Sequence, residues 1–226
     1  MALHGESDEA PRPLGRPRAI PRTLSSSVHE EILEGAARLF EANGYTATST
    51  RAIAVEVGLR QASLFHYFAR KEDILTELLD RTVRPALDMV SRHALEGFDA
   101  DVALWLLAHE DVANLCQGPN NLGMLQLLPE VQGSQFEWFW RRRRKLFRMY
   151  VAQIDRGERD GLFFDVDQFT GDVVFGMVES VITFRPQRRA HATTPSVIAD
   201  AVLRVCGVTP RRLHLVHAIV DRLEEW

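Results

Sequence analysis

The sequence predicts an all-α fold in which an N-terminal three-helix head of the helix-turn-helix type precedes a C-terminal antiparallel helical body. Apolar residues recur at helical spacing along most of the chain, and no segment shows the strict alternation of a β-strand. Two short helical segments joined by a glycine-containing turn lie on either side of residue 58. We therefore divide the chain into an arm (1–27), a head (28–72) and a body (73–226).

A proline-rich arm leads into the first predicted helix. Residues 1–27 contain four prolines and scattered arginines without apolar periodicity, which is the composition of a flexible arm. A helix is predicted over Val28–Asn43, where apolar side chains recur every three or four residues. Ser27 is placed to cap its first turn, and Gly44 is placed to end it in a left-handed conformation.

Two short helices complete the head. Thr48 or Ser49 can cap the earlier one, which runs through Val57 and ends at Gly58. The later one is predicted over residues 61–67. In a unit of this kind, the second helix is the one that lies in the major groove of DNA.

The body is predicted to consist entirely of helices. Its first helix begins near Lys71, and Pro85 should either kink it or end it, because the ring removes a backbone donor and clashes one turn back. Glycine, proline or polar residues separate the later helices. These are expected at about residues 101–116, 121–131, 135–158, 167–184, 195–206 and 210–225.

Composition argues against several classes of protein. No apolar run approaches the roughly 20 residues of a bilayer span, and the polar N-terminus lacks a signal-peptide pattern. We therefore expect a cytoplasmic protein without membrane contact. Cys116 and Cys206 are far apart and lack metal-ligand spacing, so we expect no disulfide, metal or cofactor. GxSxG, HExxH, GxGxxG and P-loop motifs are absent from the sequence, and we expect no enzymatic activity.

Charge is distributed unevenly along the chain, whose formal net charge is −4. Residues 10–27 carry +4 and residues 48–71 carry +3, so the remaining residues together carry −11. A locally cationic head on an acidic body favours the binding of one polyanion at one end of the molecule.

The stretch GYTATSTRAIAVEVGLRQASLFHYFARKEDIL, residues 44–75, resembles the signature of the tetracycline-repressor (TetR) family of transcriptional regulators. A glycine-aromatic start, an Ile-Ala pair, a Val-Gly turn, a Leu-Phe-His-Tyr-Phe segment and a Lys-Glu-Asp-Ile-Leu segment follow one another at the family's spacing. With the first helix included, the resemblance covers about 45 residues. The rest of the chain resembles the family only in length and helical pattern.

The resemblance implies which residues of the head contact DNA. Thr50 and Arg51 match positions that touch phosphate and a base edge. Gln61 can read adenine, and Ala62 can pack on a thymine methyl group. Lys71 matches a phosphate contact at a helix N-terminus. The full set expected in the head is Thr50, Arg51, Arg60, Gln61, Ala62, Ser63, Phe65, His66, Tyr67 and Lys71.

Several of these assignments have a second interpretation. Phe65 is as compatible with packing inside the head as with contacting DNA, and its neighbour Phe68 is expected to pack. His66 is expected to be a neutral polar contact to phosphate. Arg16 and Arg18 of the arm are added as candidates for the minor groove, with a solvated tail as the alternative.

An aromatic helix face predicts a small-molecule pocket in the body. Apolar and aromatic residues follow helical spacing over residues 136–154, with Arg143 in the middle of the stripe. An internal salt bridge of Arg143 with Glu110, Asp88 or Glu179 and a role in ligand recognition both stay open, because a buried arginine needs a partner. For the apolar and aromatic members of the expected ligand site, packing in the core is the alternative. The residues expected to bind ligand are Trp105, Leu106, His109, Leu125, Trp140, Arg143, Phe147, Tyr150, Phe175 and Glu179. They suit a planar aromatic compound with hydroxyl or carboxyl groups.

Two apolar segments predict a homodimer. Residues 167–184 and 195–206 have apolar stripes on more than one face and small residues that allow close helix approach. In the TetR family the last two long helices of the body form the dimer interface, so we expect Val178 and Val202 to face the two-fold partner. Residues 211–226 add an amphipathic helix whose apolar stripe needs a surface to cover.

Together these features predict a repressor that binds double-stranded operator DNA as a homodimer and is released by a small-molecule inducer. Pro85 would mark the joint between head and body, so that a ligand-driven movement of the helix at Lys71 changes the spacing of the two heads. A helical ligand-binding or adaptor protein without operator binding is the first alternative. A transcriptional activator is the second.

Overall fold

The computed structural model describes residues 27–93, 95–185 and 190–224, and within them every regular element is helical. The all-α prediction is confirmed. The α-helices are α1 (Val28–Asn43), α2 (Thr50–Glu56), α3 (Gln61–Leu64), α4 (Lys71–His93), α5 (Ala100–Cys116), α6 (Glu137–Arg159), α7 (Thr170–Phe184), α8 (Thr194–Val205) and α9 (Pro210–Glu224). Short 3-10 helices are η1 (Leu95–Gly97), η2 (Leu122–Leu127), η3 (Pro129–Gln132) and η4 (Ser134–Phe136).

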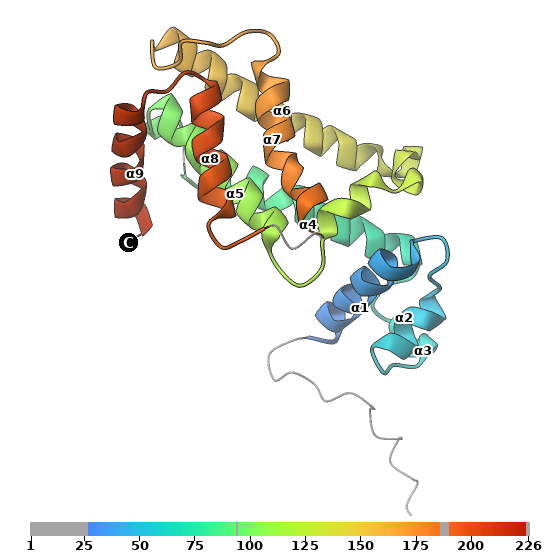
Figure 1. Cartoon of the computed structure of the whole chain (residues 1–226). Coiled ribbons are helices and arrows are strands. Elements are labelled where there is room, and N and C mark those ends of the chain that lie inside the picture. Colours follow the sequence, from blue (N-terminus) through green and yellow to red (C-terminus); the bar gives the residue numbers. More distant parts are fainter. Residues whose placement is uncertain (1–26, 94, 186–189, 225–226) are drawn as a thin grey trace, which may run out of the picture.

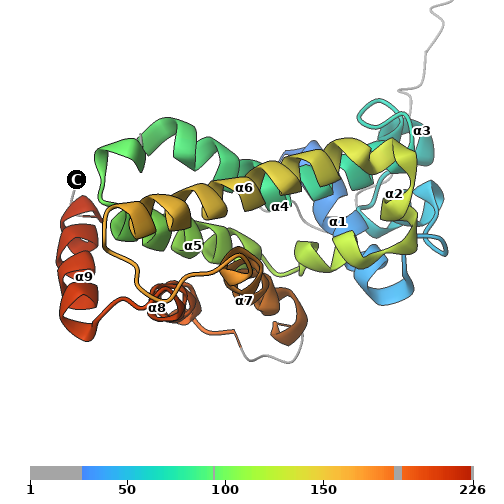
Figure 2. The ribbon, with the colours of Figure 1, turned by 90° about the horizontal axis from the view of Figure 1, so that it is seen from above.

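The head and the far end of the body lie at opposite ends of the molecule. Figure 1 shows α1, α2 and α3 grouped at one end and α9 at the other. Between them, α5 is the central helix of the body and contacts α4, α6, α7, α8 and α9. Figure 2 shows α4 and α6 running along the body towards the head. None of the described helices combines the length and apolar character that a bilayer span requires.

Local capping chemistry fixes the helix boundaries of the head. The Ser27 hydroxyl accepts a hydrogen bond from the Glu30 amide at 3.2 Å, and Gly44 ends α1 with φ of 80°. Ser49 caps α2 by accepting from the Ala52 amide at 3.0 Å. The boundaries predicted for α1 and the Ser49 alternative for α2 are therefore those of the structure.

Helix α4 continues through Pro85 instead of ending there. Proline cannot donate to the carbonyl four residues earlier, which here belongs to Arg81. The side-chain amide of Asn114, on α5, donates to that carbonyl at 3.1 Å and to the Thr82 carbonyl at 3.2 Å. A neighbouring helix thus supplies the missing donor, which sequence periodicity within α4 cannot reveal.

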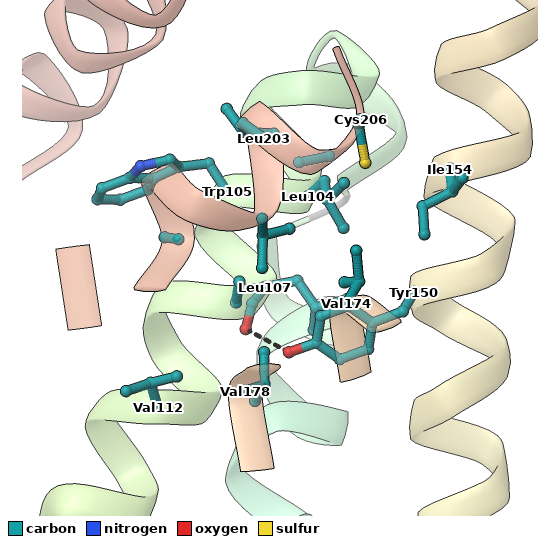
Figure 3. Close-up of a cluster of buried hydrophobic side chains, with 14 of the residues drawn as sticks. Leu104, Trp105, Leu107, Val112, Tyr150, Ile154, Val174, Val178, Leu203 and Cys206 are labelled. Atoms are coloured by element: carbon teal, nitrogen blue, oxygen red, sulfur yellow. Dashed lines mark hydrogen bonds between the residues drawn. The ribbon is translucent and has the colours of Figure 1, made fainter. Parts of the chain in front are cut away.

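The buried apolar residues form two clusters that do not follow the predicted domain boundary. One cluster fills the body between α5, α6, α7 and α8 (Figure 3). The other contains the interior of the head together with four residues that come much later in the chain. These are Leu125, Val131, Phe136 and Phe139. We call the second cluster the head core; η2, η3, η4 and the start of α6 complete it.

The residues expected at the dimer interface point into the body. Val178 and Val202 are completely buried within the single chain, and Figure 3 shows Val178 in the cluster with Tyr150. The exposed apolar residues of the same two helices are instead Val173, at 49% exposure, and Val197, with Phe169 just before α7. The prediction for Val178 and Val202 was wrong, because periodicity finds apolar stripes without showing which one faces inward.

The C-terminal helix covers the outer side of α5. Val216 and Val220 of α9 are buried against the body core, so its apolar stripe has the surface that it needs. Arg212 fixes the start of the helix: its Nη2 donates to Asp99 Oδ2 at 2.6 Å and to Asp101 Oδ1 at 3.0 Å. The Asp101 side chain is fully buried, so this ion pair compensates a charge that would otherwise be costly.

The segment predicted as one helix at 121–131 forms two short 3-10 helices instead, η2 and η3. It touches the head and the body at once, since η2 contacts α1, α4 and α7. Gly123 in η2 packs so closely on Ile182 of α7 that an added Cβ would lie 2.6 Å from Ile182 Cγ1. Asn121 Nδ2 also donates to the Ile182 carbonyl at 2.7 Å. Contacts with distant elements therefore shape this segment.

Candidate functional site

The residues expected to contact DNA lie on and around α2 and α3 with their side chains accessible. Arg51, Arg60, Gln61 and Ala62 are exposed, as are Phe65, His66 and Tyr67. Thr50, Ser63 and Lys71 are half-buried. Arg16 and Arg18 lie outside the described residues.

One hydrogen bond joins the two helices of the helix-turn-helix unit at their N-termini. Gln61 Nε2, at the start of α3, donates to Thr50 Oγ1, at the start of α2, over 3.0 Å. With respect to the described residues, the carbonyl oxygen and the second amide hydrogen of Gln61 are free for another partner. A bidentate contact to an adenine uses one acceptor and one donor of this kind.

Lys71 is held inside the head by backbone carbonyls. Its Nζ donates to the carbonyls of Tyr45 at 2.6 Å and Thr48 at 2.7 Å, and lies 4.1 Å from the centre of the Tyr45 ring. Burial lowers the pKa of Lys71. Because an ammonium group has three donors, one remains for a phosphate. Lys71 thus holds the loop between α1 and α2 in place.

Two phenylalanines of this segment have different environments. Phe68 is buried in the head core and stacks on His29 with 4.8 Å between ring centres. Phe65 remains about half exposed at the surface of the head. The structure therefore places Phe68 in the packing role and leaves Phe65 available for an external partner.

A contact from the body reaches the same loop of the head. The Thr46 hydroxyl, between α1 and α2, donates to the carboxylate of Glu130 in η3. This hydrogen bond lowers the pKa of Glu130, and the nearby Lys71 lowers it further. The segment that contains η3 thus links the body to the part of the head that carries Lys71.

In the body, six of the ten expected ligand residues gather between α6 and α7. A recess of about 340 Å³ is lined there by Trp140, Arg143, Arg144, Phe147, Asp172, Phe175, Gly176 and Glu179. Tyr150 lies directly behind it, because its ring packs edge-on against Phe175 with 5.5 Å between centres. We call this pocket the outer recess.

Arg143 is paired at the wall of the outer recess. Its guanidinium forms an ion pair with Glu179 of α7. It also lies 5.0 Å from the ring centre of Phe175 and 5.6 Å from that of Trp140. Of the three carboxylates considered for an internal salt bridge, Glu179 is the one that the structure pairs with Arg143.

Behind the recess, Tyr150 and Asp111 form a buried polar pair. The Tyr150 hydroxyl donates to Asp111 Oδ2 at 3.1 Å and approaches the Leu107 carbonyl at 3.4 Å, the contact drawn in Figure 3. Burial raises the pKa of Asp111 to about 7, although the hydrogen bond from Tyr150 opposes this shift. Burial and the neighbouring Asp111 raise the pKa of Tyr150.

Four expected ligand residues lie elsewhere. Trp105 Nε1 donates to Asp200 of α8 at 2.9 Å, and its ring stacks on His109 at 4.8 Å. Leu106 packs at the edge of the body core, whereas Leu125 belongs to the head core. Because α5 is surrounded by other helices, its side chains point towards several different neighbours, and a helical pattern alone cannot select those that face the recess.

Comparison with known proteins identifies the family. The model for bacterial regulatory proteins of the tetR family matches residues 32–78, from α1 into α4. The crystal structure of AmtR from Mycobacterium smegmatis is 39% identical to this chain, with a TM-score of 0.81. The match covers 91% of this chain and 98% of that one. The chain belongs to the tetR family.

Relatives of this TetR-family chain are transcriptional regulators. The HTH-type transcriptional repressor KstR2 of Mycobacterium tuberculosis is 28% identical over 160 residues, which are 61% of this chain and 71% of KstR2. AibR, crystallised with isovaleryl coenzyme A and operator DNA, is 22% identical with a TM-score of 0.61 over 77% of this chain and 95% of AibR, which shows the shared fold. The chain is accordingly a transcriptional regulator and not an enzyme.

Sequence reasoning missed four polar residues around these features: Asp111 and Gln126 beside the recess, Asn114 at Pro85, and Glu130 at the head. Asp111 carried a usable signal, because it is an acid within the strongly apolar helix α5. The other three act on distant segments and have no local pattern.

Proposed function

We propose that this TetR-family chain is a ligand-responsive repressor that binds operator DNA as a homodimer and leaves it when a small molecule enters the outer recess. The accessible α2–α3 face, with Gln61 positioned by Thr50, carries the DNA-binding part of the proposal. The curated relatives are repressors, and AibR was crystallised with both a ligand and operator DNA. Acting on the chromosome, such a repressor works in the cytoplasm.

In this proposal, α3 lies in the major groove and reads the bases. Gln61 contacts an adenine, and Arg51 contacts a guanine or a phosphate with its planar guanidinium. Arg60 and Lys71 contribute attraction to phosphates, which fixes the position of the head without reading sequence. This face carries few charged base readers, so phosphate contacts supply much of the affinity.

The homodimer is built from the outward faces of α7 and α8. Phe169, Val173 and Val197 are exposed there, and a two-fold axis would bury them against their copies. An interface of this kind joins two heads, so that both can bind half-sites about one DNA turn apart.

Ligand binding reaches the head through α7 and the 3-10 segment. Phe175 and Glu179 of the recess precede Ile182 on α7, and Ile182 is clamped between Asn121 and Gly123. The same segment contains Glu130, whose carboxylate accepts from Thr46 of the head. A shift of α7 is therefore passed to the head, and α4 carries the remaining connection.

Operator binding provides the test of this function. Arg51→Ala and Gln61→Ala should each weaken binding to DNA from upstream of the protein's own gene by about 1–3 kcal/mol. Fluorescence anisotropy measures the affinity, and circular dichroism should show unchanged helicity. Arg148→Ala is the matched control, because it removes an exposed arginine of α6 instead. Unchanged affinity in both head variants would contradict the assignment of the DNA-binding face.

A further inference from the structure

A second cavity lies behind the outer recess. Its volume is about 20 Å³, which is room for about one water-sized group. Arg143, Phe175 and Glu179 line both cavities, while Asp111 and Gln126 line only the inner one. The Arg143–Glu179 ion pair therefore stands where the two spaces meet. We call the second space the inner cavity.

The inner cavity is rich in hydrogen-bond acceptors. Asp111 is 3% exposed and Gln126 is 8% exposed. Within the described part of the chain, no group forms a hydrogen bond with the Gln126 side-chain amide. Two neighbouring donors have partners of their own, since Arg143 pairs with Glu179 and the Tyr150 hydroxyl donates to Asp111. Gln126 is mostly buried and lines the cavity, so its amide oxygen can accept from a donor placed there.

Charge around the cavity favours a cation. Asp111 and Glu179 are two acids, and Arg143 is the one base that lines the cavity with them. Arg143 lowers the pKa of Asp111, but burial outweighs this effect and raises it to about 7. A second positive charge beside Asp111 would stabilise its ionised form.

We propose that the inner cavity binds the primary ammonium group of a ligand whose aromatic part fills the outer recess. An ammonium group is about the size of a water molecule and has three donors, which match Asp111, Gln126 and Glu179. The Arg143 guanidinium contacts Glu179 Oε1, which leaves the other oxygen of that carboxylate for the ammonium group. Trp140, Phe147 and Phe175 supply the aromatic wall.

This assignment replaces the carboxylated ligand expected from the sequence. The expectation depended on Arg143 being available to a ligand oxygen. Its guanidinium is instead paired with Glu179, and a ligand carboxylate in the inner cavity would face the carboxyl groups of Asp111 and Glu179. Like charges repel strongly in a buried site, because little water is present to screen them.

The ligand class is tested with three probes of similar shape and different charge. Isothermal titration calorimetry of the full chain at neutral pH compares 2-phenylethylamine, 2-phenylethanol and phenylacetate. The amine should bind at least about tenfold more tightly than the other two, since charge-assisted hydrogen bonds are about twice as strong as neutral ones. Asp111→Asn should remove that preference. Glu110→Gln, which neutralises the adjacent exposed acid of α5, should preserve it.

Three results would overturn the proposal: equal affinity for amine and alcohol, tighter binding of phenylacetate, or no binding of any probe at millimolar concentration, as expected if the cavity holds water alone. If Asp111→Asn fails to fold by circular dichroism, Gln126→Leu replaces it, and an unchanged amine preference in that variant would also count against the proposal. The role of amine binding in regulation rests on the proposed function. Calorimetry without DNA keeps the two separable, because operator binding can fail while amine binding persists.

Discussion

The head and the body place their functional groups in opposite ways. In the head, Arg51 and Gln61 lie on the outside of a small core, where a large partner can reach them. In the body, Asp111 and Gln126 are buried and line the inner cavity, which has room for about one water molecule. An outward surface that fits regular DNA keeps a recognisable sequence pattern. An interior cavity depends on which helix faces happen to meet.

The largest expected effect tests whether the head core extends into the body. Phe139→Ala, at the start of α6, should destabilise the protein by about 3–5 kcal/mol, because it empties a fully buried ring position. The loss should also speed amide hydrogen exchange in α1, although Phe139 is far from α1 in sequence. Phe147→Ala, a half-buried position on the same helix, should leave exchange in α1 unchanged. If amide exchange in α1 were equally slow in both variants, the stability of α1 would not depend on Phe139, and the prediction would be contradicted.

The exposed and the buried side of α7 should differ in their effect on dimerisation. Val173→Asp should give monomers of 25.6 kDa by light scattering and weaken operator binding by about 100-fold or more, because two linked heads gain effective concentration. Its fold should persist, since Val173 is exposed. Val178→Asp is the comparison: it buries a charge in the body core and should unfold the monomer. A Val173→Asp protein that stays dimeric would move the interface elsewhere.

The buried acid of the body should make stability depend on pH. Asp111 has its pKa raised from 3.8 to about 7, so the folded state holds its proton more tightly than the unfolded state. Its contribution is complete below pH 4 and is lost as pH rises through 7. Tyr150, Glu179 and Arg143 are the ionisable groups that act on it.

The stability of Asp111→Asn relative to the unaltered protein should therefore rise by about 2–3 kcal/mol between pH 5 and pH 8. Urea unfolding at both pH values measures this difference, in which ionisations common to the two proteins cancel. The same difference at both pH values would contradict a proton held at Asp111. Glu56→Gln on α2, which removes a carboxylate outside the body, serves as the control.

The smallest effect concerns the contact between the two regions. Glu130→Gln keeps an acceptor for Thr46 but removes a negative charge near Lys71. Operator affinity should rise about two- to fivefold at low salt, which matches the modest value of surface charge interactions. High salt should remove the gain. Thr46→Val keeps the charge and should show no gain; tighter binding by that variant would point to the hydrogen bond instead.

The sequence predicted the parts of the fold that depend on local chemistry. Ser27 and Gly44 set the ends of α1 because a cap and a left-handed turn need only their immediate neighbours. The sequence shows only the local effect of Pro85. That α4 continues through this proline depends on Asn114 of another helix, which donates to the Arg81 carbonyl. The segment at 121–131 likewise forms 3-10 helices where it packs against elements that are distant in the sequence.

Prediction of the candidate sites followed the same division. The candidate DNA-contact residues of α2 and α3 were assigned through a motif that spans one stretch of chain. In the body, candidate ligand residues on α6 were assigned through its aromatic pattern. Arg143 pairs with Glu179, which was one of the alternatives proposed for it. Trp105 and His109 were assigned to the pocket because α5 is apolar on most sides, and nothing in its pattern separates one neighbour from another.

The extent of the head core has a consequence for exchanging heads between relatives. A chimera joined near residue 72 would keep α2 and α3 but would separate Phe40 and Ile53 from Leu125 and Phe139, which belong to the same cluster. The head of this chain is therefore not portable as one continuous stretch of gene. A transplant that preserves its packing must carry two separate cassettes, the first ending within α4 and the second running from η2 into α6.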